Sequence, residues 1–245
     1  MDNKPKLRPI EAFPVQHRMR DAVIAAERDG APASLVYAMG LTAALHVHRR
    51  EPEAAADLIH ATRQLLRGRV YGRSDVYSGF ILGWSMVQRG DTSRGIDLIA
   101  EAARELRAGT LKVDWTKFLA RLGEAQIRAG CATDALTTLD EALAAAASTG
   151  ERYYEPELLR LRGEALETLG DPAADTWYVR AIELARAQHA TAWELRASTS
   201  LARVWLKAGQ RGEARTLLEA ICGWFTEGHD TLDFIDAVTL LRAAT

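Results

Sequence analysis

Residues 161–172 read Leu-Arg-Gly-Glu-Ala-Leu-Glu-Thr-Leu-Gly-Asp-Pro, and they contain the end of one helix and the start of another. Leu161 and two further apolar residues follow one another at four-residue intervals, which places them on one face of a helix. Gly170 comes directly after them, where a helix commonly ends in a left-handed residue. The Asp-Pro pair that follows suits the cap and first turn of a second helix. The stretch therefore predicts the centre of a helical hairpin.

The same turn recurs about every forty residues along the chain. Equivalent turn positions are Arg50, Gly90, Gly130, Gly170 and Gly209. A small residue stands seven positions before each turn, at Ala43, Gly83, Gly123, Gly163 and Ala202. A second small residue follows most turns by five positions, at Ala55, Gly95, Ala135 and Ala214, whereas in the fourth repeat Ala174 follows by four. Small residues on both sides of a turn predict that the two helices approach closely, once in every repeat.

These repeats predict the organisation of the whole chain. No segment shows a sustained two-residue hydrophobic period, so we expect an all-α protein. Residues 1–12 are expected to form a flexible tail and residues 13–245 a single solenoid. The predicted hairpins lie near 32–66, 74–106, 114–148, 155–188 and 192–225, with an additional helix from Pro14 to Asp29 and a cap helix over 231–243. The cap helices are expected to close the two open ends of the stack.

Small residues seven before and five after an interhelical turn resemble the tetratricopeptide repeat, here with a period of about forty instead of thirty-four. This resemblance implies a right-handed superhelical solenoid of about five hairpins that binds a protein partner in its concave groove. Residues 151–244 are also similar to the C-terminal repeat region of bacterial regulators that carry a nucleotide cyclase or transcriptional module and an ATPase module. That likeness is carried by Glu151-Arg-Tyr-Tyr-Glu155, Leu161-Arg-Gly-Glu164, Leu195-Arg-Ala-Ser-Thr-Ser-Leu-Ala-Arg203 and Gly223-Trp-Phe-Thr-Glu-Gly228. No cyclase or ATPase sequence is present, so neither activity is implied.

Composition and motifs argue against several classes of function. A formal net charge of −2 does not indicate the concentrated basic face that nucleic acid binding needs. No phosphate-binding loop, dinucleotide fingerprint or hydrolase motif occurs, and we expect no catalytic residue and no cofactor. The two cysteines, Cys131 and Cys222, lack metal-ligand spacing, and no apolar signal segment opens the chain, so we expect a cytoplasmic protein without a metal site. Residues 31–48 lack charged side chains but fall in register as a solenoid helix, which we favour over a membrane span.

In tetratricopeptide arrays the first helix of each hairpin lines the groove, and this resemblance selects the candidate binding residues. They are Tyr37, Tyr77, Phe80, Trp84, Gln88, Lys117, Arg128, Arg160, Arg196, Arg203 and Lys207. The aromatic members come from the first two repeats and the charged members from the last three. Each group has an alternative interpretation, because the aromatics can fill the interior of a tightly wound superhelix and the charges can form ordinary pairs one helical turn apart.

Two functional hypotheses follow from this pattern. The first is a non-catalytic interaction scaffold in a bacterial cytosolic regulatory assembly, whose groove takes a helix or segment of another protein. Its apolar side chains would contact the aromatic residues, and an acidic group would contact the basic ones. The second is an effector-sensing domain that binds a small molecule or signalling peptide in the groove. A second copy of the chain is a further candidate partner.

Overall fold

The structure is a computed structural model that describes residues 15–30, 32–66, 73–109 and 113–244. The predicted tail, residues 1–12, lies outside this part of the chain.

Twelve helices and no strands are present in the described residues. The helices are α1 Val15–Asp29, α2 Pro32–Arg49, α3 Pro52–Leu66, α4 Arg73–Gln88, α5 Thr92–Ala108, α6 Trp115–Arg128, α7 Ala132–Thr149, α8 Glu155–Thr168, α9 Ala174–Ala187, α10 Thr191–Lys207, α11 Arg211–Cys222 and α12 Leu232–Ala243. The predicted all-α fold is confirmed.

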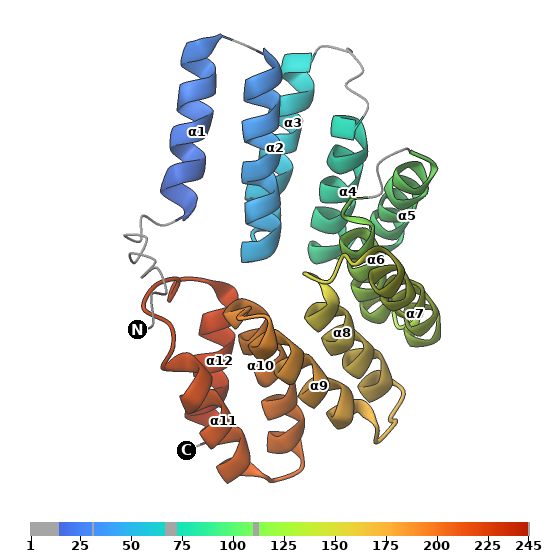
Figure 1. Cartoon of the computed structure of the whole chain (residues 1–245), viewed down its shortest axis with the longest axis vertical. Helices are drawn as coiled ribbons and strands as arrows, with labels where there is room; N and C mark the ends of the chain where they lie inside the picture. Colours follow the sequence, from blue (N-terminus) through green and yellow to red (C-terminus); the bar gives the residue numbers. More distant parts are fainter. Residues whose placement is uncertain (1–14, 31, 67–72, 110–112, 245) are drawn as a thin grey trace, which may run out of the picture.

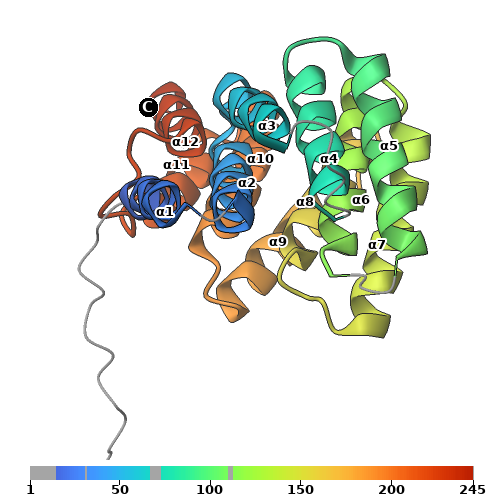
Figure 2. The same cartoon turned by 90° about the horizontal axis from the view of Figure 1, so that it is seen from above.

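The helices pair into five hairpins, from α2/α3 to α10/α11, with α1 at one end and α12 at the other. The first helices of successive hairpins, α2, α4, α6, α8 and α10, each contact the next one and form a continuous inner row. Figure 1 shows the array curving so that α10 to α12 return toward the lower ends of α1 and α2. Figure 2 shows the same stack from above, with α5 and α7 on the outside. The inner row therefore forms the concave face.

The turn between α8 and α9 has the predicted left-handed residue, with Gly170 at φ +73°. The Asp171 N–H donates to the Leu166 carbonyl at 2.9 Å, which satisfies a carbonyl at the end of α8. The second helix begins at Ala174 instead of Pro172, because Asp171 Oδ1 accepts from the Ala173 N–H at 2.8 Å and holds a turn before the helix. The Ala174 N–H donates to the carbonyl of Asp171, three residues back, whereas the equivalent Gly95 and Ala135 N–H groups donate to a carbonyl four residues back. This tighter turn accounts for the displacement of the small residue by one position.

Small residues permit the closest helix approach, as the sequence indicated. A Cβ atom added to Gly83 on α4 would lie 2.8 Å from the Gly95 carbonyl oxygen on α5, and one on Gly95 would lie 2.6 Å from the Gly83 carbonyl oxygen. In the fourth repeat a Cβ on Gly163 would meet the Tyr178 ring at 2.8 Å and the Ala174 carbonyl oxygen at 3.2 Å. Backbone thus contacts backbone in the second hairpin, where any larger residue would push the helices apart.

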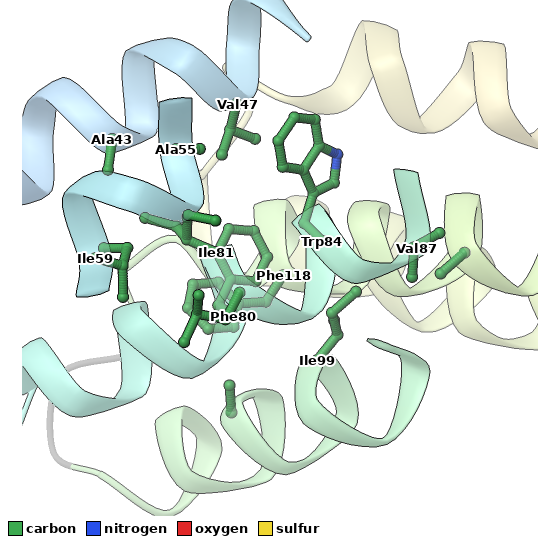
Figure 3. Close-up of a cluster of buried hydrophobic side chains, with 14 of the residues drawn as sticks. Ala43, Val47, Ala55, Ile59, Phe80, Ile81, Trp84, Val87, Ile99 and Phe118 are labelled. Atoms are coloured by element: carbon green, nitrogen blue, oxygen red, sulfur yellow. The ribbon is translucent and has the colours of Figure 1, made fainter. Parts of the chain in front are cut away.

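The largest hydrophobic cluster of the N-terminal half surrounds α4. Phe80 and Trp84 are 2% and 1% exposed, and the Phe80 ring stacks on Phe118 of α6 with ring centroids 4.0 Å apart. Figure 3 shows these side chains between α2, α4 and α5, together with Ile81 and Ile99. We expected Phe80 and Trp84 to face the open groove, and the structure instead places both in the core. The physical reason is the tight curvature, which brings α2 and α6 over the inner face of α4.

Candidate functional site

The concave face contains two pockets of opposite chemistry. The first, which we call the apolar pocket, lies between α2, α4 and α6 and has a volume of about 570 Å³. It is lined by Ala33, Val36, Tyr37, Gly40, Leu41, Ala44, Ser74, Tyr77, Asp114 and Lys117. Tyr37 is 71% exposed and Leu41 is 42% exposed, so two large apolar side chains face solvent on this surface. Exposed apolar groups gathered in a hollow are typical of contact sites.

Asp114 organises the polar edge of the apolar pocket. Its carboxylate accepts hydrogen bonds from the Tyr77 and Tyr153 hydroxyls and pairs with Lys117 Nζ at 3.0 Å. Burial alone would raise the pKa of Asp114, but these two hydroxyls and the Lys117 ammonium together lower it below its ordinary value. The Lys117 ammonium also lies 5.2 Å from the centre of the Tyr77 ring. Tyr77 and Lys117 are therefore held in fixed positions at the pocket wall.

The second pocket, which we call the charged pocket, has a volume of about 180 Å³ and lies between α6, α8, α10, α12 and the turn after α2. Its lining consists of Arg50, Glu124, Arg128, Arg160, Glu164, Arg196, Thr199, Ser200, Arg203, Asp233 and Asp236. Arg128 lies 3.7 Å from Glu124, too far for a hydrogen bond, and is 41% exposed. Arg203 is exposed, and no ion pair to it is present among the described residues. These two guanidinium groups can donate hydrogen bonds to an anionic group that enters the pocket from solvent.

Beneath the charged pocket lies a buried network of ion pairs. The Glu157 carboxylate accepts from Arg160 Nε at 2.8 Å and from Arg196 Nη2 at 2.7 Å. Arg196 reaches on to Asp233 of α12 at 3.2 Å. Burial would raise the pKa of Glu157, yet the positive charges of Arg160 and Arg196 hold it well below its ordinary value. The network ties α8 to α10 and to α12 through charge-assisted hydrogen bonds.

His48 lies in the last turn of α2 and lines neither pocket, and the two pockets share no lining residue. Its ring lies 6.2 Å from that of Tyr154 and 6.0 Å from that of Trp193, measured between centroids. The residue is exposed, while the protein atoms around the ring reduce its hydration. This desolvation, followed by the charges of Arg121 and Lys117, lowers the pKa of His48 to about 4. His48 is therefore neutral at neutral pH, close to the cationic side chains of Arg121 and Lys117.

The candidate binding residues fall into three groups. Tyr37, Tyr77 and Lys117 line the apolar pocket, and Arg128, Arg160, Arg196 and Arg203 line the charged pocket. Phe80 and Trp84 are core residues. Gln88 is half-buried at the end of α4, and Lys207 pairs with Glu167 at 2.7 Å. Neither residue lines the apolar or the charged pocket. The candidate residues that line a hollow are thus divided between these two pockets.

Several pocket residues were not predicted from the sequence. Arg50 comes from an interhelical turn, and Asp233 and Asp236 come from the cap helix. The repeat pattern could not predict these residues, because the curvature of the whole array, and not the repeat itself, brings them to the charged pocket. Within the described ranges, no group of three or more His, Cys, Asp or Glu residues is arranged to hold a metal ion. None of the described helices combines the length and the apolar character that a membrane crossing would require.

Neither protein families nor curated proteins gave a match to the sequence. Solved structures do match. The NprR structure in complex with its cognate peptide NprX has a TM-score of 0.69 at 13% identity, over 94% of this chain and 65% of that one. The Rap conjugation gene regulator of plasmid pLS20, in complex with the Phr* peptide, has a TM-score of 0.57 at 12% identity, over 94% and 70%. Yeast Tom70 has a TM-score of 0.56 at 15% identity, over 97% and 44%.

These likenesses concern the fold, since each identity is below a fifth. Together with the five hairpins they confirm a tetratricopeptide-like helical repeat architecture. The chain spans about two thirds of the NprR chain that it matches.

Proposed function

We propose that this protein is a non-catalytic binding module that takes a segment of another protein or a peptide on its concave face. The observation that carries the proposal is the pairing of an apolar pocket, in which Tyr37 and Leu41 face solvent, with a charged pocket that presents Arg128 and Arg203. Apolar side chains of a partner would occupy the first hollow, and an acidic group would pair with the second.

The partner class is supported by the structural neighbours. Two of them, NprR and the Rap regulator, are seen in complexes with peptides, and the fold of the present chain is similar to theirs, with TM-scores of 0.69 and 0.57. We infer a role in a bacterial cytosolic regulatory assembly, with the peptide or protein partner acting as the regulatory signal. The absence of a catalytic motif in the sequence agrees with a binding role.

A second candidate function is the sensing of a small molecule. The charged pocket favours it, since a volume of about 180 Å³ suits a group much smaller than a helix. A ligand that binds only the folded protein raises its stability with the logarithm of ligand concentration. Thermal shift measurements against metabolite pools, without any protein partner, would separate this function from the first.

The binding function is tested with a variant that alters only exposed groove residues. Tyr37→Ser/Leu41→Ser removes the solvent-facing apolar side chains and leaves the core intact. The matched control, Leu169→Ser/Val179→Ser, removes two exposed apolar side chains, 51% and 39% exposed, outside both pockets. A displayed random peptide library should yield enriched peptides on the wild type and on the control but not on the groove variant. Equal enrichment on all three would contradict the proposal.

A further inference from the structure

Arg50 is an unusual residue for its position. It has φ +63°, and the other four interhelical turns of the same series carry glycine in the left-handed conformation, at Gly90, Gly130, Gly170 and Gly209. A residue with a Cβ atom is strained in this conformation, whereas glycine is not. Strain at a non-glycine residue persists only where the surroundings favour that side chain, and it points to a role for it.

The Arg50 side chain reaches the opposite end of the solenoid. Arg50 Nη1 lies 2.6 Å from Asp236 Oδ2 and 3.2 Å from Asp233 Oδ1, both on α12. The neighbouring Arg49 pairs with Asp230 at 2.8 Å. Two arginines at the turn between α2 and α3 thus meet three aspartates, one just before α12 and two in its first two turns. Figure 1 shows α12 returning toward this end of α2.

Ion pairs, not a hydrophobic interface, join the first hairpin to α12. The hydrophobic cluster around α10, α11 and α12 contains no residue of α2 or α3, and the cluster around α4 contains none of α12. The pairs are also partly solvated, with side-chain exposures of 31% for Arg50, 40% for Asp236 and 69% for Asp230. Solvated pairs are individually weak and are screened by salt. Repeats of a solenoid otherwise contact mainly their neighbours. A further described contact between the first hairpin and the C-terminal hairpins is that of the His48 ring with the Trp193 ring, and the ion pairs are the charged part of this closure.

We infer that Arg50 is a latch that closes the superhelix on α12 and can release it. The same ion pairs shape the charged pocket, because Arg50, Asp233 and Asp236 all line it. Opening the latch separates Arg50 from the two aspartates and widens that pocket. That opening controls the binding of a partner in the charged pocket rests on the proposed function. The opening itself can be measured on the protein without any partner.

The distance between the two ends can be measured with spin labels on the outer helices. Labels at His60→Cys on α3 and Ala220→Cys on α11, both exposed positions, report the separation by double electron–electron resonance. Cys131→Ser and Cys222→Ser remove the two native thiols. At low salt we expect one narrow distance distribution, and at 1 M NaCl, where the Debye length is about 3 Å, a longer and broader one.

Arg50→Gly should produce the open distribution at low salt while keeping the helical content, because glycine suits the left-handed backbone. His189→Gly is the matched control. His189 is likewise a non-glycine residue at positive φ, 54°, with an exposed side chain in a turn outside the latch. It reports any effect of relieving backbone strain alone, and we expect the wild-type distribution for it.

A charge exchange completes the test. Asp236→Arg alone should give the longer and broader distance distribution. The double variant Arg50→Asp/Asp236→Arg should restore the narrow one, since aspartate tolerates the left-handed conformation at position 50. An unchanged distribution in Arg50→Gly, an indifference of the wild type to salt, or a double exchange that stays open would each overturn the latch. If the distance measurements confirm the latch but no peptide binds to the protein, the proposed binding function is contradicted and the latch is not.

Discussion

Repeats two and four place opposite chemistry at equivalent positions of one fold. Phe80 stands three residues before Gly83, and Arg160 stands three residues before Gly163. Phe80 is buried among apolar side chains, whereas Arg160 is buried against the Glu157 carboxylate. The comparison teaches that the hairpin geometry depends on the small residues and turns, while the inner surface is free to be a hydrophobic core or an ionic network. The two halves should therefore respond differently to substitution, salt and acid.

The largest expected effect is on the hydrophobic half. Trp84→Ala removes one of the largest fully buried side chains and should lower the free energy of unfolding by about 3–5 kcal/mol. The loss should be nearly the same at low and high salt, because no charge is involved. Urea unfolding followed by circular dichroism measures it. Tyr37→Ala, at a 71% exposed position, is the control and should change the value by less than about 0.5 kcal/mol.

The ionic half should respond next most strongly. Glu157→Gln removes the anion that Arg160 and Arg196 share, and leaving two buried guanidinium groups without it should cost about 3 kcal/mol. Glu219→Gln breaks a solvated pair with Arg215 on α11 and should cost at most about 0.5 kcal/mol. Equal effects of the two substitutions in the same urea titration would mean that the buried network does not stabilise this half.

A smaller effect distinguishes two glycines of α4, of which only Gly83 lies at a close helix approach. Gly83→Ala places a methyl group 2.8 Å from a backbone oxygen that cannot move without its helix, so we expect a loss of about 2 kcal/mol. Gly79→Ala, one turn earlier on α4, meets nothing nearer than 3.9 Å and should gain up to about 1 kcal/mol from helix propensity. Thermal unfolding of both variants compares them. A stabilised Gly83→Ala variant would contradict the close backbone contact.

The smallest effect is the acid response of the ionic half. The pKa of Glu157 is lower in the folded than in the unfolded protein, where it is about 4.3. Its contribution to stability is therefore complete above that value and decreases as the pH falls below it, because only the unfolded chain binds the proton. The slope approaches about 1.4 kcal/mol per pH unit. Urea titrations from pH 6 to pH 3 should show a shallower decline for Glu157→Gln than for the wild type.

The sequence predicted the architecture because each hairpin is a local unit. Gly163 and Gly170 mark a close approach and a turn whose geometry involves only neighbouring residues, and the left-handed conformation at the equivalent turns followed directly. The concave face was harder to predict. Trp84 occupies a position that a wider superhelix would expose, and whether it is covered depends on the curvature of the whole stack.

The same reason explains the unpredicted charged residues. Arg50 and Asp236 are 186 residues apart and meet only after four intervening hairpins have curved through their full arc. Small angular changes at each hairpin add up over this distance, and no local pattern records their sum. The rings of His48 and Trp193, 6.0 Å apart between centroids, meet across the concave face for the same reason.

Site-specific photo-crosslinking tests the central claim, a partner on the concave face, most directly. A photoreactive phenylalanine analogue would replace Tyr37 in the apolar pocket and, in a second protein, Val179 on α9, which is 39% exposed and lines neither pocket. Both proteins are irradiated in the native cytosol, and crosslinked products are identified by mass spectrometry. We expect a defined protein or peptide crosslinked from position 37 and absent from position 179. The same products from both positions, or none from position 37, would contradict it.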